Sequence, residues 1–132
     1  MRTTKMLACL GTLTVCLGVP SLSVADDNCC SGHFVQVGSR PIATSSDPSL
    51  PGHPAIGECH GTGAGVGNCA FKDKDGDEWT NEWRSVPDVA GKFTWKVVRA
   101  TGKLANVTWS GWSQQTRREG DVIIWVWGGN CN

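Results

Sequence analysis

The sequence contains no tyrosine and no excess of charge of either sign, because twelve Lys and Arg residues balance twelve Asp and Glu residues. Proteins that bind nucleic acid usually present a basic face, and Arg117–Arg118 is the only adjacent basic pair in the chain. We therefore expect no nucleic-acid partner. The sequence also lacks an apolar run of the roughly 20 residues that a helix needs to cross a bilayer, so we expect no membrane span.

No segment of the sequence predicts a convincing helix, and no recognised nucleophile motif occurs in it. Adjacent thiol and imidazole groups, as in Cys59–His60, do not by themselves supply an oriented base and an oxyanion pocket. The sequence therefore favours a protein that is not an enzyme, and it leaves any catalytic residues unknown.

The first 25 residues are typical of an export signal. Basic residues precede an apolar run from Met6 to Val19, and small residues that end at Ala25 suit a cleavage site. We expect residues 1–25 to be removed, so that residues 26–132 form a single domain that is secreted or periplasmic.

Five of the seven cysteines follow this expected leader, and an oxidising compartment favours two disulfides between them. Cys59 and Cys69 flank a glycine-rich turn, which makes a local bridge easy. Cys131 is expected to pair with Cys29 or Cys30, and we take Cys30 as the candidate. A bond between Cys29 and Cys30 themselves is not expected, because neighbouring cysteines rarely bridge each other. One thiol is then left over, and it would allow two chains to form a dimer.

Prolines are concentrated in residues 39–57, where four of them stand among serines and glycines. This composition predicts a long loop. Beyond it, short runs rich in tryptophan, valine and threonine are separated by glycine-containing turns at intervals of about 8–12 residues, the spacing of all-β domains.

The clearest predicted hairpin spans residues 69–83. Its turn is Asp75–Gly76, a pair suited to a backbone with positive φ. Alternation at period two then predicts which side chains share one face of the second strand. They are Trp79, Asn81 and Trp83.

The last predicted strand, residues 121–127, is apolar on both faces. Both faces should therefore be covered, and such a strand is unsuited to an open sheet edge. The fold class that we expect is all-β, a small antiparallel up-and-down β-barrel stapled by disulfides.

Seven tryptophans are concentrated in this small domain. Each brings about 150–250 Å² of apolar area, so most of them must lie in the core. A barrel of about eight strands has room either for side chains or for one small ligand. We expect a subset to contact a small apolar or aromatic ligand, namely Trp79, Trp83, Trp125 and Trp127.

Three aspartates, Asp73, Asp75 and Asp77, alternate on the hairpin turn, where carboxylates can converge on a calcium ion. An EF-hand that began at Asp73 would need glycine where Glu78 stands and glutamate where Arg84 stands. We interpret the aspartates as a solvated hairpin turn, with a weak calcium site as the alternative.

Thiol and imidazole groups form a second cluster in the sequence, and such groups bind zinc or copper. Bridged sulfur is a poor metal ligand, however, and exported proteins usually bridge their cysteines. We therefore expect no metal and no cofactor. A metal site remains the alternative, and its ligands would be Cys30, His33, Cys59 and His60, with His53 nearby.

The stretches Asn68–Asp77, Gly91–Trp95 and Ala100–Gly111 contain a Cys, an Asp-x-Asp-Gly-Asp hairpin and a Thr-Gly-Lys turn. In this arrangement the sequence resembles a group of small exported bacterial proteins that look like allene oxide cyclase and dirigent-type barrels. The resemblance covers roughly the second half of the expected mature chain. It implies an up-and-down barrel of about eight strands, but neither an activity nor a catalytic residue.

The strand pattern and the missing catalytic motifs favour an exported barrel with a binding or structural role. One alternative is a barrel enzyme of the cyclase or isomerase type. Such an enzyme would need polar groups such as Glu82, Arg84 or Arg99 to converge in a pocket. The other alternative is the metal-binding protein described above.

Overall fold

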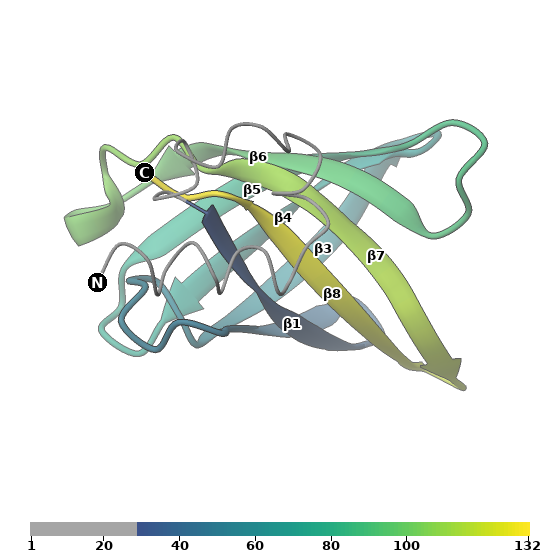
Figure 1. Cartoon of the computed structure of the whole chain (residues 1–132), viewed down its shortest axis with the longest axis horizontal. Helices are drawn as coiled ribbons and strands as arrows, with labels where there is room; N and C mark the ends of the chain where they lie inside the picture. The colour runs from purple at the N-terminus through teal and green to yellow at the C-terminus, as the bar shows by residue number, and fades with distance from the viewer. Residues whose placement is uncertain (1–28) are drawn as a thin grey trace.

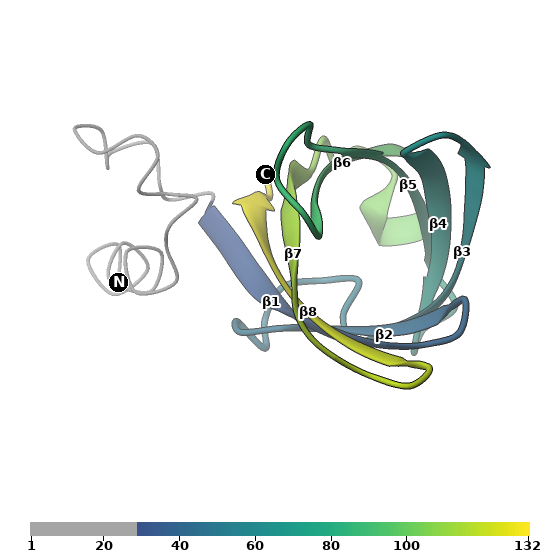
Figure 2. The same ribbon diagram turned by 90° about the vertical axis from the view of Figure 1, so that its right-hand side faces the viewer.

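The computed structural model of the protein describes residues 29–132, so the predicted export signal lies outside the described residues. Eight antiparallel strands close into a barrel in sequence order, and the first strand is hydrogen-bonded to the last (Figure 1). A view turned by 90° shows the strands arranged in a ring (Figure 2). The expected all-β barrel is confirmed. Its strands are β1 (Cys29–Val37), β2 (Arg40–Ser45), β3 (Ala55–Gly63), β4 (Val66–Asp73), β5 (Glu78–Ser85), β6 (Lys92–Ala100), β7 (Ser110–Glu119) and β8 (Val122–Asn130).

The connections fall into two groups at opposite ends of the barrel, because the strands run alternately up and down. Short turns join β1 to β2, β3 to β4 and β7 to β8 at the first end, where residues 86–91 also join β5 to β6. We call this the hairpin end. At the other end, the long-loop end, residues 46–54 join β2 to β3 and residues 101–109 join β6 to β7.

One short helical turn, η2 (Gly102–Leu104), lies in the long-loop end of the described chain. Its Leu104 is completely buried. No helix among residues 29–132 is long and apolar enough to cross a membrane.

The hairpin predicted around Asp75–Gly76 is present and joins β4 to β5. Gly76 has a φ of 85°, which glycine adopts without steric cost. The predicted alternation in β5 is also present, because Trp79 and Asn81 are buried whereas Glu82 is exposed. The periodicity therefore placed the inner face of this strand correctly.

The long loop predicted for residues 39–57 is shorter than expected, because Arg40–Ser45 form β2 and Ala55 begins β3. Pro41 lies inside β2 with a fully buried side chain. Proline donates no backbone hydrogen bond and is tolerated in strands whose ladder is incomplete. The ladder between β2 and β3 is short, since its paired residues are Ile42 with Ile56 and Ala43 with Ala55.

The last strand is covered on one face only. Trp125 and Trp127 of β8 are buried inside the barrel. On the outer face, Ile124 and Val126 are half-buried and Val122 is 36% exposed. The prediction that both faces are covered is therefore wrong for the outer face, because barrel closure pairs the edges of a strand without covering its outer surface.

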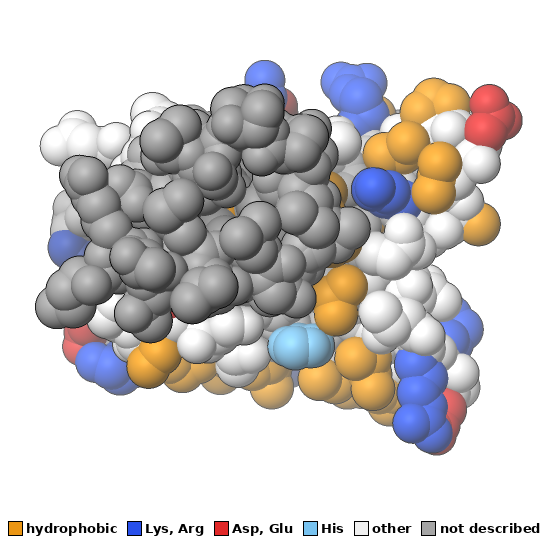
Figure 3. Space-filling model, in the orientation of Figure 1, with side chains coloured by type: hydrophobic (Ala, Val, Ile, Leu, Met, Phe, Trp, Pro, Cys, Tyr) orange, Lys and Arg blue, Asp and Glu red, His pale blue; other side chains and the backbone are white. Residues whose placement is uncertain are grey.

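Exposed aliphatic side chains continue across the outer face of the neighbouring strands. Val35 on β1 lies opposite Ile42 on β2, and Ile42 lies opposite Ile56 on β3. All three side chains are exposed, and hydrophobic atoms line the lower edge of the molecule in Figure 3. The wall formed by β1, β2 and β3 thus carries apolar residues on its outer side as well as in the lumen.

Candidate ligand-binding cavity

The barrel contains a cavity of about 240 Å³. Its walls are mainly aromatic, and no Asp, Glu, Lys or Arg of the described chain lines it. Small-molecule sites commonly combine apolar walls with a few polar groups in this way. The lining residues are Phe34, Gln36, Ala43, His53, Cys59, Cys69, Phe71, Trp79, Asn81, Trp83, Phe93, Trp95, Trp109, Ser113, Trp125, Trp127 and Cys131.

Toward the long-loop end, three indole rings surround the imidazole of His53. The ring centroids of Trp79, Trp109 and Trp127 lie 5.6, 5.9 and 5.3 Å from the centroid of His53. All three tryptophans are buried. We call these four residues the inner group.

The inner group is held by hydrogen bonds to the backbone. Trp79 Nε1 donates to the carbonyl of Gly52 at 3.3 Å, and Trp127 Nε1 donates to the carbonyl of Thr44 at 3.1 Å. Gly52 has a φ of 80°, and a Cβ there would lie 3.2 Å from Leu104. Glycine is therefore required where the loop 46–54 turns into the barrel, and the two indole N–H groups are satisfied there.

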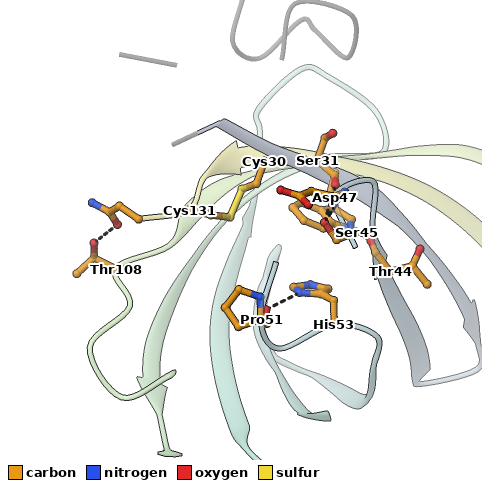
Figure 4. The surroundings of a disulfide bond; sticks show 11 residues. Cys30, Ser31, Thr44, Ser45, Asp47, Pro51, His53, Thr108 and Cys131 are labelled. Atoms are coloured by element: carbon orange, nitrogen blue, oxygen red, sulfur yellow. Dashed lines mark hydrogen bonds between the residues drawn. A yellow bond between two sulfur atoms is a disulfide. The ribbon is translucent and has the colours of Figure 1, made fainter. Parts of the chain in front are cut away.

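His53 reaches the cavity from the loop 46–54. Its Nδ1 lies 3.2 Å from the carbonyl oxygen of Pro51 (Figure 4). A carbonyl only accepts hydrogen bonds, so Nδ1 carries the proton of the neutral ring. Burial lowers the pKa of His53, and the hydrogen bond to Pro51 and the charge of Asp73 oppose this effect only in part. The imidazole is therefore neutral at pH 7.

A second set of rings, which we call the outer group, lies nearer the hairpin end and consists of Phe34, Trp83, Phe93 and Trp125. Phe34 stacks on Trp125 with ring centroids 5.2 Å apart. Phe93 meets Trp83 and Trp125 edge to face, at 5.3 and 5.5 Å. Trp125 is buried, whereas the other three side chains are only half-buried.

Two buried polar atoms on the cavity wall have no hydrogen-bond partner among the described residues. They are Asn81 Oδ1 and Trp125 Nε1, and each residue is 8% exposed. Leaving such an atom unpaired costs about 1–3 kcal/mol. A third such atom, Trp112 Nε1, belongs to a residue outside the lining. Asn81 and Trp125 both line the cavity, and the described part of the fold leaves one buried acceptor and one buried donor without a partner there.

Both predicted disulfides are present, Cys30–Cys131 and Cys59–Cys69. The first lies at the long-loop end, near His53 (Figure 4). Cys29 is also disulfide-bonded, and no cysteine among residues 29–132 is free. The leftover thiol that was expected to allow a dimer is therefore not found in this part of the chain, and the dimer has no structural support.

Each of the four tryptophans predicted to contact a ligand lines the cavity. Trp79 and Trp127 belong to the inner group, and Trp83 and Trp125 belong to the outer group. The structure brings these side chains together in one lumen, and their contact with a ligand stays a prediction.

Sequence reasoning missed several residues of the cavity. Asn81 gave a signal, because it lies between Trp79 and Trp83 on the face expected to be buried. His53 gave no signal for the lumen, since a proline-rich loop has no periodicity that would orient its side chains. Phe34 lies in β1, a strand that the sequence analysis did not predict.

The polar groups that the barrel-enzyme alternative would need do not line the cavity. Glu82, Arg84 and Arg99 are exposed. Glu82 and Arg84 alternate with Trp83 along β5 and therefore point to the outer face. These three residues therefore do not meet the requirement of the barrel-enzyme alternative.

The residues of the alternative metal site are not brought together either. Cys30 and Cys59 belong to different disulfides, and His33 and His60 are exposed. Within residues 29–132, no group of three or more His, Cys, Asp or Glu side chains is arranged to hold a metal ion. Both cysteines of this alternative site are bonded in disulfides, as the favoured interpretation expected.

The aspartates of the β4–β5 turn surround a lysine from the loop 101–109. Lys103 Nζ lies 2.8 Å from Asp73, 3.1 Å from Asp75 and 2.5 Å from Asp77. Burial acts to raise the pKa of Asp73, but hydrogen bonds from Lys103 and from backbone amides outweigh it and hold that pKa below its ordinary value. The turn is thus ion-paired, with an ammonium group where the alternative placed calcium.

Comparison of the chain with protein-family models, with curated proteins and with solved structures gave no match. The eight-stranded barrel agrees with the fold that the resemblance to allene oxide cyclase and dirigent-type barrels implied. Membership of that group stays a prediction.

Proposed function

We propose that the protein is an exported, non-enzymatic β-barrel that binds a small apolar or aromatic molecule in its lumen. The observation that carries the proposal is the cavity of about 240 Å³, with aromatic walls and no Asp, Glu, Lys or Arg from residues 29–132 in its lining. Protein interiors are packed with few voids larger than a water molecule. A barrel that served only as a scaffold would fill its lumen with side chains.

The volume indicates the size of the ligand. An apolar cavity of about 150 Å³ holds one benzene molecule. The cavity in this barrel, at about 240 Å³, is larger by more than half. It remains below the roughly 300 Å³ at which sites for drug-sized ligands begin. Two fused rings match this volume better than a single ring or a long chain.

The arrangement of the walls favours a flat ligand. Phe34 and Trp125 are nearly parallel, with an angle of 16° between their planes, and Phe93 meets Trp125 at 61°. Offset stacking and edge-to-face contact are the two arrangements that aromatic rings prefer. A planar molecule among these rings has both kinds of contact available.

The disulfides support a location outside the cytoplasm, because disulfides persist in oxidising compartments. The leader predicted at residues 1–25 points the same way. We therefore place the binding role in the periplasm or outside the cell. Kinship with allene oxide cyclase and dirigent-type barrels is part of the same proposal, and the barrel topology supports it.

Titration with 2-methylnaphthalene, followed by tryptophan fluorescence and calorimetry, tests the proposal. Ala43 lines the cavity and is 3% exposed, whereas Ala70 is exposed on the outer face of β4. Ala43→Leu fills part of the lumen, and Ala70→Leu adds the same side chain outside it. We expect the parent protein and Ala70→Leu to bind alike, and Ala43→Leu to bind at least about tenfold more weakly.

Absence of binding by the parent protein, or equal binding by all three proteins, would contradict a site in the lumen. Circular dichroism establishes that the variants are folded. Because overpacking a core costs about 1–3 kcal/mol, Ala43→Leu is paired with Ser113→Val. Ser113 also lines the cavity, so this second variant decides the matter if the first does not fold.

A further inference from the structure

Asn81 is the first of two residues on the cavity wall with a buried polar atom that lacks a hydrogen-bond partner within residues 29–132. It lies on β5 between Trp79 and Trp83, lines the lumen and is 8% exposed. Its Oδ1 accepts no hydrogen bond from any described residue. Buried side-chain oxygens are hydrogen-bonded in the large majority of cases, so this acceptor is an exception that the described part of the fold itself leaves without a donor.

Trp125 supplies the second group. Three lumen tryptophans can be compared: Trp79 and Trp127 donate their indole N–H to backbone carbonyls, whereas Trp125 Nε1 has no acceptor among the described residues. Trp125 is as deeply buried as the other two. Within the described chain, the fold therefore leaves its N–H without an acceptor.

The two groups lie on different walls. Asn81 belongs to β5 and Trp125 to β8, and β6 and β7 separate these strands in the barrel. A ligand that pairs with both walls carries its donor and its acceptor on separate atoms. An open-chain amide meets this requirement, because its N–H donates, its carbonyl oxygen accepts, and the two can point in opposite directions.

The charge of the ligand is also constrained. No Asp, Glu, Lys or Arg of the described chain lines the cavity, and His53 is neutral there. A carboxylate or an ammonium group would lose its hydration without gaining a counter-ion. Charged ligands are therefore disfavoured.

We propose that the lumen binds a neutral amide of a fused two-ring aromatic, whose N–H pairs with Asn81 Oδ1 and whose carbonyl accepts from Trp125 Nε1. This inference rests on the proposed function and names the class of its ligand. The outer group would contact the rings, and the two unpaired atoms would fix the orientation.

Three probes of nearly equal shape test the inference by calorimetry. 2-Naphthamide carries both the donor and the acceptor, 2-naphthoate is its charged counterpart without a donor, and 2-methylnaphthalene has no polar group. We expect 2-naphthamide to bind at least about tenfold more tightly than 2-methylnaphthalene, as one or two buried hydrogen bonds would give. No measurable binding is expected for 2-naphthoate.

Two variants identify the groups that recognise the amide, and a third serves as the control. Asn81→Leu and Trp125→Phe each remove one polar partner and keep much of the apolar wall. Trp112→Phe removes another unpaired indole N–H, but from a residue outside the cavity lining. We expect the first two variants to reduce the preference for 2-naphthamide about tenfold, with little change for 2-methylnaphthalene, and Trp112→Phe to keep the preference.

The outcomes separate the two proposals. If none of the probes binds the parent protein, the proposed function fails and the inference fails with it. If 2-methylnaphthalene binds as tightly as 2-naphthamide, the lumen is a binding site but the amide class is wrong. A preference that survives in both Asn81→Leu and Trp125→Phe overturns the assigned contacts. If one of these variants does not fold, the other variant decides.

Discussion

The two ends of the cavity are built from the same kind of side chain but differ in how their polar atoms are used. In the inner group, Trp79 and Trp127 donate their N–H groups to backbone carbonyls. In the outer group, Trp125 is equally buried and its N–H has no partner among the described residues. Among these buried lumen tryptophans, the aromatic ring is common to both ends, and the unpaired N–H is what sets Trp125 apart from Trp79 and Trp127.

The two ends also differ in what surrounds them. Residues 46–54 fold over the inner group, and Leu104 packs against this loop at Gly52. The outer group faces short turns, and Phe34, Trp83 and Phe93 are only half-buried. We infer that the inner group mainly stabilises the barrel and that the outer group mainly contacts the ligand.

The largest expected effect concerns the covalent closure of the long-loop end. Cys30 and Cys131 are 101 residues apart in sequence, whereas Cys59 and Cys69 are 10 apart. Loop entropy predicts that replacing the first pair by alanine costs about 4–5 kcal/mol, roughly 2 kcal/mol more than replacing the second pair. Urea unfolding measures both losses. Equal losses would mean that the two pairs contribute alike to the barrel.

A comparison of Trp79→Ala with Trp83→Ala tests the division of roles directly. Trp79 is 6% exposed and stacks on Phe71 with centroids 4.1 Å apart. Its truncation should cost about 3–5 kcal/mol of unfolding free energy, and that of the half-buried Trp83 roughly half as much. Thermal and urea unfolding give the values. A larger loss for Trp83→Ala would reverse the assignment of core and site.

Ligand affinity should show the opposite order. Phe93→Ala removes a half-buried ring of the outer group that meets both Trp83 and Trp125. We expect it to weaken binding of 2-methylnaphthalene about tenfold, because edge-to-face contacts and buried area are lost together. Leu104→Ala is the matched control, since Leu104 is fully buried but lies outside the lining. Binding that falls equally in both variants would argue against a local role for Phe93.

The smallest effect is a pH dependence that arises from the inner group. Burial lowers the pKa of His53 in the folded protein, so the unfolded chain binds more protons as the pH falls below about 6.5. Stability should therefore be complete above that pH and decrease below it, by at most about 1.4 kcal/mol per pH unit. His53→Gln should remove this dependence. An unchanged profile in that variant would show that His53 is not its source.

Much of the barrel was predictable because its strands follow simple rules. Alternation at period two identified the inward face that carries Trp79, Asn81 and Trp83. The Asp75–Gly76 turn was evident from its preference for positive φ. Cysteine spacing predicted the local Cys59–Cys69 bond, and it limited the partner of Cys131 to Cys29 or Cys30. The same alternation also places Glu82 on the outer face, so the barrel-enzyme alternative had a contrary signal in the sequence.

The rest depended on contacts between distant segments. Lys103 meets Asp77 only because residues 101–109 and the β4–β5 turn share one end of the barrel. His53 enters the lumen through a proline-rich loop, which has no periodic pattern to read. The N–H of Trp127 is satisfied by Thr44, 83 residues away in sequence. A hydrogen bond between segments so far apart in sequence depends on the assembled barrel, so rules based on neighbouring residues do not predict it.

The short ladder between β2 and β3 has a consequence for how the protein moves. Its paired residues are Ile42 with Ile56 and Ala43 with Ala55, whereas β1 and β8 pair along their entire length. Local opening begins where few hydrogen bonds must break. We therefore expect amide hydrogen exchange to be fastest at the junction of β2 and β3 and slowest along β1 and β8. The seam between β2 and β3 is thus the weakest part of the wall around the lumen, and the barrel should breathe there before it opens anywhere else.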